Sequence, residues 1–261
     1  MPTPEHIFTS EVDAVINAVR NGIDTTLGPS LVGLYIFGSL ISGDFDSDVS
    51  DMDLLAVLTD DPSDVVGDAL RQTHDNLAKD YAGWKDRIEV IYVSQAGLRD
   101  FRSVRHIMGV ISPGEPFRTI PATPQWVVNW YAARKENMRL IGPAIETLIP
   151  PISRDEYVQA VRHYMRDFMA RVTDKSSLGS QAYAILSVCR GLYACRFGEK
   201  VSKNRAAAWA REQFPQWAQI IDDALEWRQH QWEAQPAGAG EQTASRTQQF
   251  VAQIAALALE P

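Results

Sequence analysis

Two aspartates near the start of an apolar run are the residues of this chain best suited to chemistry. Asp51 and Asp53 flank Met52, and the run continues to Leu58 as an expected β-strand. Side chains alternate between the two faces of a strand, so both carboxylates point to one face. Two carboxylates placed in this way repel each other unless a divalent cation lies between them, and Mg²⁺ is commonly held by one or two carboxylates together with phosphate oxygens. The pair therefore predicts a magnesium site that receives a phosphorylated ligand.

A turn and a third acid complete this pattern. Gly38 and Ser39 follow the apolar run 31–37, which we expect to be a buried strand that ends in a tight turn. Glycine lets the backbone approach a phosphate, and serine adds a hydroxyl to the exposed N–H groups. Glu89 interrupts the apolar run 87–93, where an acid needs a partner such as a metal or a substrate proton. Taken in order, these features predict a metal-dependent nucleotidyltransferase in which Glu89 is the third carboxylate.

Each feature also has a plain structural interpretation. Asp51 and Asp53 could form a polar strand edge. Gly38 and Ser39 could form an ordinary turn, and Glu89 could face outward from its strand. A nucleotide-binding sensor without turnover is a further alternative, although the presence of all three carboxylates argues against it.

The elements that position these residues form an α+β domain followed by a helical domain. Periodicity and turn residues predict three helices, over 10–27, 63–80 and 126–140, and three strands, over 31–37, 51–58 and 87–93. Ser10 and Ser63 are the expected N-caps of the first two helices, and the proline-rich segment 113–124 is an expected loop.

Pro150 and Pro151 mark the expected linker between the two domains, which we place at residues 1–149 and 150–261. Helical spacing recurs throughout the second domain and predicts a bundle with helices that include 203–213, 215–232 and 243–258.

Charge is unevenly distributed along a chain whose net charge is -8. Ten aspartates and no basic residue lie between Arg20 and Arg71, whereas eleven Lys and Arg face five acids from Arg154 to Arg211. The acidic part would attract metal ions or a polycationic substrate, and the basic part would suit phosphates. Both parts could also be ordinary solvated faces. The acidic balance argues against a stable nucleic-acid partner.

The composition bounds the class of protein. A chain of 261 residues with 45% hydrophobic and 22% charged residues can bury a core, which excludes disorder, collagen and coiled coil. No run of 18 apolar residues and no basic-then-apolar N-terminal segment is present, so we expect neither a membrane span nor a secretion signal. Cys189 and Cys195 match neither a redox pair nor a zinc knuckle. We expect core cysteines in a cytoplasmic monomer.

The signature residues resemble a known group of enzymes. Phe37-Gly38-Ser39 followed by Ser50-Asp51-Met52-Asp53 resembles the polymerase-β-like nucleotidyltransferase signature. The chain as a whole is similar to the streptomycin/spectinomycin type of aminoglycoside adenylyltransferase, roughly over residues 30–230, with a departure over about 94–125. The segments that carry this similarity are Leu140 to Pro143, Ile185 to Arg190, Gly198 to Lys203 and Ala206 to Trp209. The resemblance implies a polymerase-β-like N-terminal domain, a C-terminal helical bundle and a role in antibiotic resistance.

Roles for the N-terminal residues follow from this resemblance. In that family ATP and two Mg²⁺ ions bind between the domains. The resemblance implies that Ser39 and Ser50 contact phosphates and that Asp51 and Asp53 hold metal. It also implies that Glu89 is the general base, and we include Glu89 among the metal ligands.

Two basic residues of the helical half complete the expected nucleotide site. The resemblance implies that Arg190 and Lys203 reach the triphosphate. Arg190 could instead be a snorkelling residue at the core edge, and Lys203 could be a solvated lysine in the first turn of a helix.

The acceptor is the least determined part of the expected reaction. The resemblance implies that AMP is transferred to a hydroxyl of a small cationic antibiotic and that pyrophosphate is released. Family members carry a Trp and several acids just before the arginine-bearing helix, whereas the segment 173–183 has one acid and no Trp. The family also tends to have a Tyr near position 229, where this chain has Gln229. A protein, an RNA or another metabolite therefore stays open as the acceptor of the same chemistry.

Overall fold

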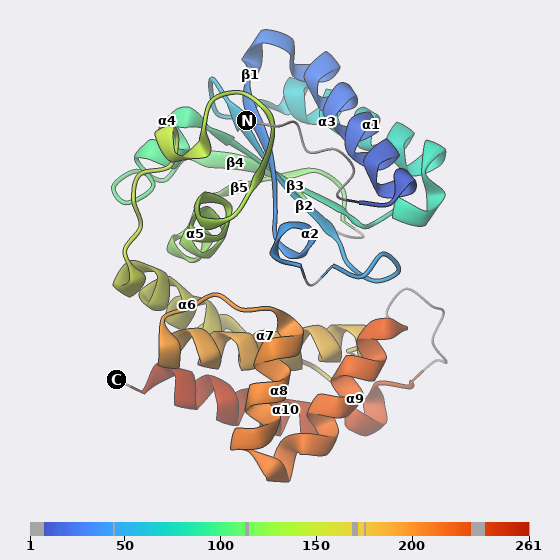
Figure 1. Cartoon of the computed structure of the whole chain (residues 1–261), viewed down its shortest axis with the longest axis vertical. Helices are drawn as coiled ribbons and strands as arrows, with labels where there is room; N and C mark the ends of the chain where they lie inside the picture. The colour runs from blue at the N-terminus through green and yellow to red at the C-terminus, as the bar shows by residue number, and fades with distance from the viewer. Residues whose placement is uncertain are drawn as a thin grey trace. The chain divides into compact units, whose positions relative to one another are not determined.

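The chain forms two compact units, each described here by itself because their relative position is not determined (Figure 1). The computed structural model describes residues 8–43, 45–112, 115–168, 172–174, 176–230 and 238–260. The first unit comprises residues 1–123 and 132–151, and the second comprises 124–131 and 152–261. The boundary after residue 149 stays a prediction, and the segment 124–131 groups with the second unit.

A six-stranded mixed sheet forms the centre of the first unit. Its strands are β1 (Leu31–Phe37), β2 (Met52–Leu58), β3 (Ile88–Ser94), β4 (Ile107–Ile111), β5 (Arg118–Pro121) and β6 (Met138–Ile141). The spatial order is β5-β4-β3-β2-β1-β6, and only β2 and β3 run parallel. The three predicted strands are confirmed to within one residue at each end, as is the predicted α+β class.

Two long helices, α1 (Ser10–Leu27) and α3 (Asp64–Asp80), lie side by side over one face of this sheet (Figure 1). Two short helices, α2 (Ser39–Ser42) and α4 (Gln95–Arg99), follow β1 and β3. The apolar stripe of α1 and alternate residues of the central strands form one core, which contains Val15, Val19, Ile23, Leu34, Ile36, Leu54, Val90 and Tyr92 among others. Because strand side chains alternate, the residues between them in sequence face the other side of the sheet.

The N-caps of the two long helices are side-chain acceptors. The Ser63 hydroxyl accepts from the Val66 N–H at 3.4 Å, so the predicted cap of α3 is confirmed. The prediction of Ser10 as the cap of α1 is wrong by one residue. Thr9 has the extended backbone of a cap and accepts from the Val12 N–H at 3.4 Å, while Ser10 is already helical.

The segment after β3 differs from the sequence-based expectation. The sequence does not predict β4, and β5 lies within the segment predicted as a loop. Pro121 is tolerated there because β5 is an edge strand, where a missing N–H costs no ladder hydrogen bond. The helix predicted over 126–140 is a 3₁₀ turn, η3 (Pro124–Trp126), then α5 (Val127–Lys135), and its expected last residues instead form β6. Pairing with the edge of β1 outweighs the local helical pattern of β6.

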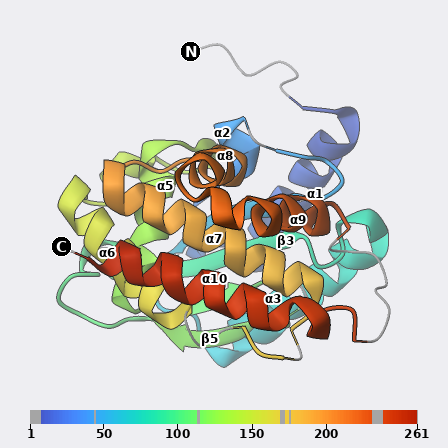
Figure 2. The same cartoon turned by 90° about the horizontal axis from the view of Figure 1, so that it is seen from below.

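The second unit is a helical bundle, as predicted. Its helices are α6 (Arg154–Phe168), α7 (Leu178–Phe197), α8 (Lys203–Gln213), α9 (Ala218–Gln229) and α10 (Glu241–Leu259). Figure 2 shows α6, α7 and α10 side by side, and α7 packs against each of the other four helices. The helix predicted over 215–232 begins with a 3₁₀ turn, η5 (Pro215–Trp217), and residues 231 and 232 of that prediction lie outside the described residues.

Both cysteines are free thiols on the central helix α7, and burial raises the pKa of Cys189 to about 12. Cys189 is buried in the core as expected, and Cys195 is partly buried and packs against that core. No helix in the described part of the chain is long and apolar enough to cross a membrane.

A partly buried histidine is expected to make the stability of the first unit depend on pH. His74 on α3 shares a 2.8 Å hydrogen bond with the Tyr92 hydroxyl on β3, and burial lowers the pKa of His74 to about 4. In the unfolded chain its pKa is about 6.5. The unfolded state therefore binds more protons between these values, so the contribution of His74 is fully present above pH 6.5 and is lost as the pH falls.

We expect the His74→Gln variant to remove this pH dependence, because glutamine can bond the Tyr92 hydroxyl without titrating. Lowering the pH from about 7.5 to 5 should reduce the free energy of unfolding of the parent by about 2 kcal/mol more than that of the variant. Urea unfolding of both proteins at the two pH values measures the difference. Parallel pH dependence would contradict a neutral His74 in the folded state.

Candidate active site

Two carboxylates are paired on the face of the sheet turned away from α1 and α3. Asp53 and Glu89 are direct partners in the parallel register of β2 and β3. Their neighbours Leu54 and Val90 lie in the core under the helices, so the two acids face the opposite side. Both acids are partly exposed. Two of the three carboxylates predicted from the sequence thus lie beside each other.

Asp51 enters this region from the loop rather than from the strand. It precedes the first residue of β2 and is partly exposed. It lies close to the guanidinium of Arg87, because Asp51 is the first of the acids that raise the pKa of Arg87, although burial lowers that pKa more. Asp51 therefore has a cationic neighbour, which offsets part of its repulsion from Asp53.

The donor chemistry of these acids suits Mg²⁺. Within the described residues no group of three or more His, Cys, Asp or Glu side chains is arranged as a metal site. Mg²⁺ does not need such a cage, since it is usually held by one or two carboxylates with substrate phosphates and water. The paired oxygens of Asp53 and Glu89 fit this mode, and metal binding by Asp51, Asp53 and Glu89 stays a prediction.

Gly38 lies against the Asp53 side chain. The last residue of β1, Phe37, pairs with Asp53, and Gly38 then turns the chain with φ 80° and ψ −147° into α2. A Cβ atom at Gly38 would overlap the Asp53 carboxylate. Only glycine combines this backbone conformation with the close approach. The turn predicted at Gly38 and Ser39 is confirmed, and it adjoins the carboxylate pair, with Ser39 partly exposed at the start of α2.

Ser50 is engaged within the loop that leads to the carboxylates. It is buried, its hydroxyl oxygen accepts from the Asp46 N–H at 3.0 Å, and its own N–H donates to the Asp46 carbonyl at 2.8 Å. These bonds give Ser50 a structural role in the loop. The phosphate contact expected of Ser50 stays a prediction.

Arg190 and Lys203 belong to the second unit, whose position relative to the carboxylates is not determined. Arg190 lies on α7 and is partly buried, and Lys203 is the first residue of α8. The Lys203 ammonium lies 5.3 Å from the centre of the Tyr183 ring. Sequence reasoning missed Tyr183 as a partner, although its spacing of seven from Arg190 places both on one face of α7. The phosphate contacts of Arg190 and Lys203 stay predictions.

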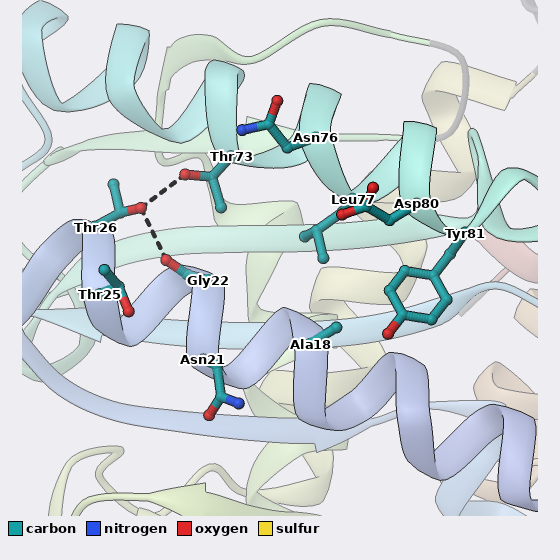
Figure 3. A pocket seen from close by; sticks show the side chains of 10 residues that line it. All are labelled: Ala18, Asn21, Gly22, Thr25, Thr26, Thr73, Asn76, Leu77, Asp80 and Tyr81. Atoms are coloured by element: carbon teal, nitrogen blue, oxygen red, sulfur yellow. Dashed lines mark hydrogen bonds between the residues drawn. The ribbon is translucent and has the colours of Figure 1, made fainter.

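A hollow of about 410 Å³ lies between α1 and α3 and is separate from the carboxylates (Figure 3). Its lining includes Thr26 and Thr73, whose hydroxyls share a 2.7 Å hydrogen bond. Since α1 and α3 cover the other face of the sheet, this hollow is not part of the site formed by Asp53 and Glu89.

Comparison with known proteins finds similarity in the sequence of the helical part and in the fold of the chain. Residues 147–254 match the sequence model described as "Aminoglycoside adenylyltransferase, C-terminal domain". The fold is similar to that of the spectinomycin adenyltransferase AAD(9) from Enterococcus faecialis, solved with ATP and spectinomycin, with 18% sequence identity and a TM-score of 0.72 over 92% of this chain and 99% of that chain. No curated protein matches the sequence. Residues 147–254 therefore share the sequence pattern of the C-terminal domain of aminoglycoside adenylyltransferases, and the chain shares the fold of the AAD(9) structure.

Proposed function

We propose that this protein transfers AMP from Mg-ATP to a hydroxyl of an aminoglycoside-type acceptor and releases pyrophosphate. The observation that carries the proposal is the pairing of Asp53 with Glu89 beside the turn at Gly38. The family match supports an adenylyl transfer, and the AAD(9) structure, which holds ATP and spectinomycin, supplies the candidate nucleotide and the class of acceptor.

Asp51, Asp53 and Glu89 would hold Mg²⁺, with phosphate oxygens of ATP completing its ligands. When bound, the metal would offset negative charge on the attacking and leaving oxygens. Without it the carboxylates would repel the triphosphate, so we expect activity to depend on added Mg²⁺.

Glu89 is the candidate general base. Its carboxylate would take the proton from the acceptor hydroxyl as that oxygen attacks the α-phosphorus in line. A new bond forms between the acceptor oxygen and the α-phosphorus, and the bond from the α-phosphorus to the oxygen bridging to the β-phosphate breaks. Pyrophosphate leaves with that bridging oxygen, AMP stays on the acceptor, and Glu89 passes its proton to water.

Binding of the triphosphate would use both units. Gly38 and Ser39 would let the backbone approach phosphate oxygens. Ser50 would contact these oxygens from the loop before β2. Arg190 and Lys203 would supply positive charge from the helical unit. Tyr183, whose ring faces the Lys203 ammonium, would limit the positions that this ammonium takes.

The acidic segment 44–68 favours a cationic acceptor, because it carries nine aspartates and no basic residue, and Arg87 and Arg71 offset only part of this charge. The segment 173–183 favours a second candidate, since it has only one acid and no Trp. Under that candidate the same transfer acts on a protein, an RNA or another metabolite.

Substitution of either paired carboxylate should abolish transfer with the fold intact. We expect Asp53→Asn and Glu89→Gln each to lower turnover by about 10³-fold or more, because metal binding and proton transfer are lost. Pyrophosphate release from Mg-ATP with streptomycin, spectinomycin and other aminoglycosides measures this, and Asp80→Asn, at an exposed aspartate that ends α3, is the control.

Unchanged turnover in either variant would refute the assignment of the carboxylates. Release that depends on Glu89 with one drug would identify the acceptor class. Binding of Mg-ATP without release from any drug would favour the second candidate.

Alanine variants of two glycines with positive φ distinguish the effect of backbone strain from that of damage to the site. Gly38→Ala should destabilise the protein by roughly 1–3 kcal/mol and displace Asp53, because its Cβ would overlap that carboxylate. Gly43→Ala is the matched control, since Gly43 has φ 77° and a Cβ there meets nothing within 4 Å. We expect it to cost roughly 1 kcal/mol and to keep turnover. Unfolding curves measure the stability of both variants, and pyrophosphate release measures their turnover. Equal turnover of the two variants would show that Gly38 has no role in the site.

The helical unit should affect nucleotide binding rather than the chemical step. We expect Arg190→Gln to raise the KM for ATP about tenfold or more, because a hydrogen bond to a charged group contributes roughly 1.5–3 kcal/mol. Arg196→Gln, on the exposed side of the same helix, should leave KM unchanged. Steady-state kinetics with varied ATP tests this, and an unchanged KM in Arg190→Gln would remove Arg190 from the nucleotide site.

A further inference from the structure

A buried arginine holds the loop that leads to the carboxylates. Arg87, the residue before β3, is only 7% exposed, and its guanidinium lies 4.6 Å from the centre of the Trp84 ring. Its Nη2 donates to the carbonyls of Ser47 at 2.6 Å and Ser50 at 2.7 Å. Its Nε donates to the Ser50 carbonyl at 3.2 Å, and its Nη1 to the Gly83 carbonyl at 3.3 Å. The planar guanidinium of Arg87 thus links the loop before β2 to the turn before β3.

The backbone of the same residue extends this attachment into the strand. The Arg87 carbonyl accepts from the Met52 N–H at 2.8 Å, and Met52 lies between Asp51 and Asp53. This bond continues directly into the register that pairs Asp53 with Glu89. Arg87 therefore contacts the chain on both sides of Asp51, at Ser50 and at Met52.

The positive charge of Arg87 lies among acidic side chains. Asp51, Asp48 and Asp46 raise the pKa of Arg87, while burial lowers it more. Arginine stays protonated under such desolvation, so it supplies a permanent positive charge next to these aspartates. If Arg87 acted by its charge alone, the geometry of the guanidinium would not matter, and a lysine could replace the arginine.

We propose that Arg87 is a positioning residue of the adenylyl-transfer site, which fixes the segment 47–53 so that Asp51 and Asp53 face Glu89. This inference rests on the proposed function, since it assigns Arg87 to the nucleotide site described above. Arg87 acts through the loop carbonyls and does not itself touch the substrate.

The affinity for a metal–nucleotide complex distinguishes a positioning role of Arg87 from a role as a counter-ion. The probe is Mn²⁺ with the α,β-methylene analogue of ATP, which binds without transfer and needs no acceptor. The variants are Arg87→Lys, which keeps the charge but loses the planar guanidinium, and Arg87→Met, which loses both. Arg99→Met, with a side chain 67% exposed, is the control. We expect both Arg87 variants to weaken binding about tenfold or more, as is usual when partners that orient metal ligands are removed.

The alternative results are distinct. A role as counter-ion alone would leave Arg87→Lys unchanged and make Arg87→Met bind the cation more tightly. Unchanged affinity in both variants would overturn the positioning role while leaving the proposed function in place. Failure of the parent protein to bind the probe would overturn the proposed function itself.

A measurement on the parent protein covers the case in which the variants do not fold. The amides of Val49 and Ser50 donate to the Asp46 carbonyl at 3.2 and 2.8 Å, and the Met52 amide donates to the Arg87 carbonyl. In a loop fixed by Arg87 these three amides should exchange slowly with solvent deuterium. Exchange at these amides as fast as in an unfolded chain would overturn the proposal.

Discussion

The parallel pairing of β2 with β3 is the constraint on which the candidate site depends. It places Asp53 directly beside Glu89, and the alternation of side chains keeps both acids on the face away from α1 and α3. A shift of one residue in this register would turn one of the acids into the apolar core. The core packing under the helices, with residues such as Leu54 and Val90, therefore also fixes which acids meet.

Bringing acids together costs electrostatic free energy, and the surrounding residues limit that cost. Arg87 places a permanent positive charge close to Asp51 and bonds the carbonyls of the loop before it. Gly38 leaves room for the Asp53 carboxylate where any side chain would overlap it. The contacts of Arg87 and Gly38 thus help to hold the acids in position, an arrangement that suits a site whose metal arrives with a phosphorylated substrate.

Elements with strong local signals are predictable from the sequence, and elements that depend on distant partners are not. The strand Leu31–Phe37 is an apolar run closed by Gly38, and the structure has it with the same bounds. The strands β4 and β5 escape prediction because they are short and β5 is an edge strand that ends at Pro121, and β6 because it forms by pairing with the distant strand β1. The carboxylates could be chosen by type and spacing, but the register between Asp53 and Glu89 could not. The role of Arg87 is not predictable from the sequence, because its partners are backbone carbonyls, which leave no side-chain signature.

The most direct test of the central claim is to locate the metal with its nucleotide. Crystals grown with Mn²⁺ and the α,β-methylene analogue of ATP would reveal the ion by its anomalous scattering. We expect a peak on the order of 2 Å from carboxylate oxygens of both Asp53 and Glu89, in contact with phosphate oxygens of the analogue. Nucleotide and Mn²⁺ bound elsewhere, with Asp53 and Glu89 away from both, would contradict the assignment of this pair as the centre of adenylyl transfer.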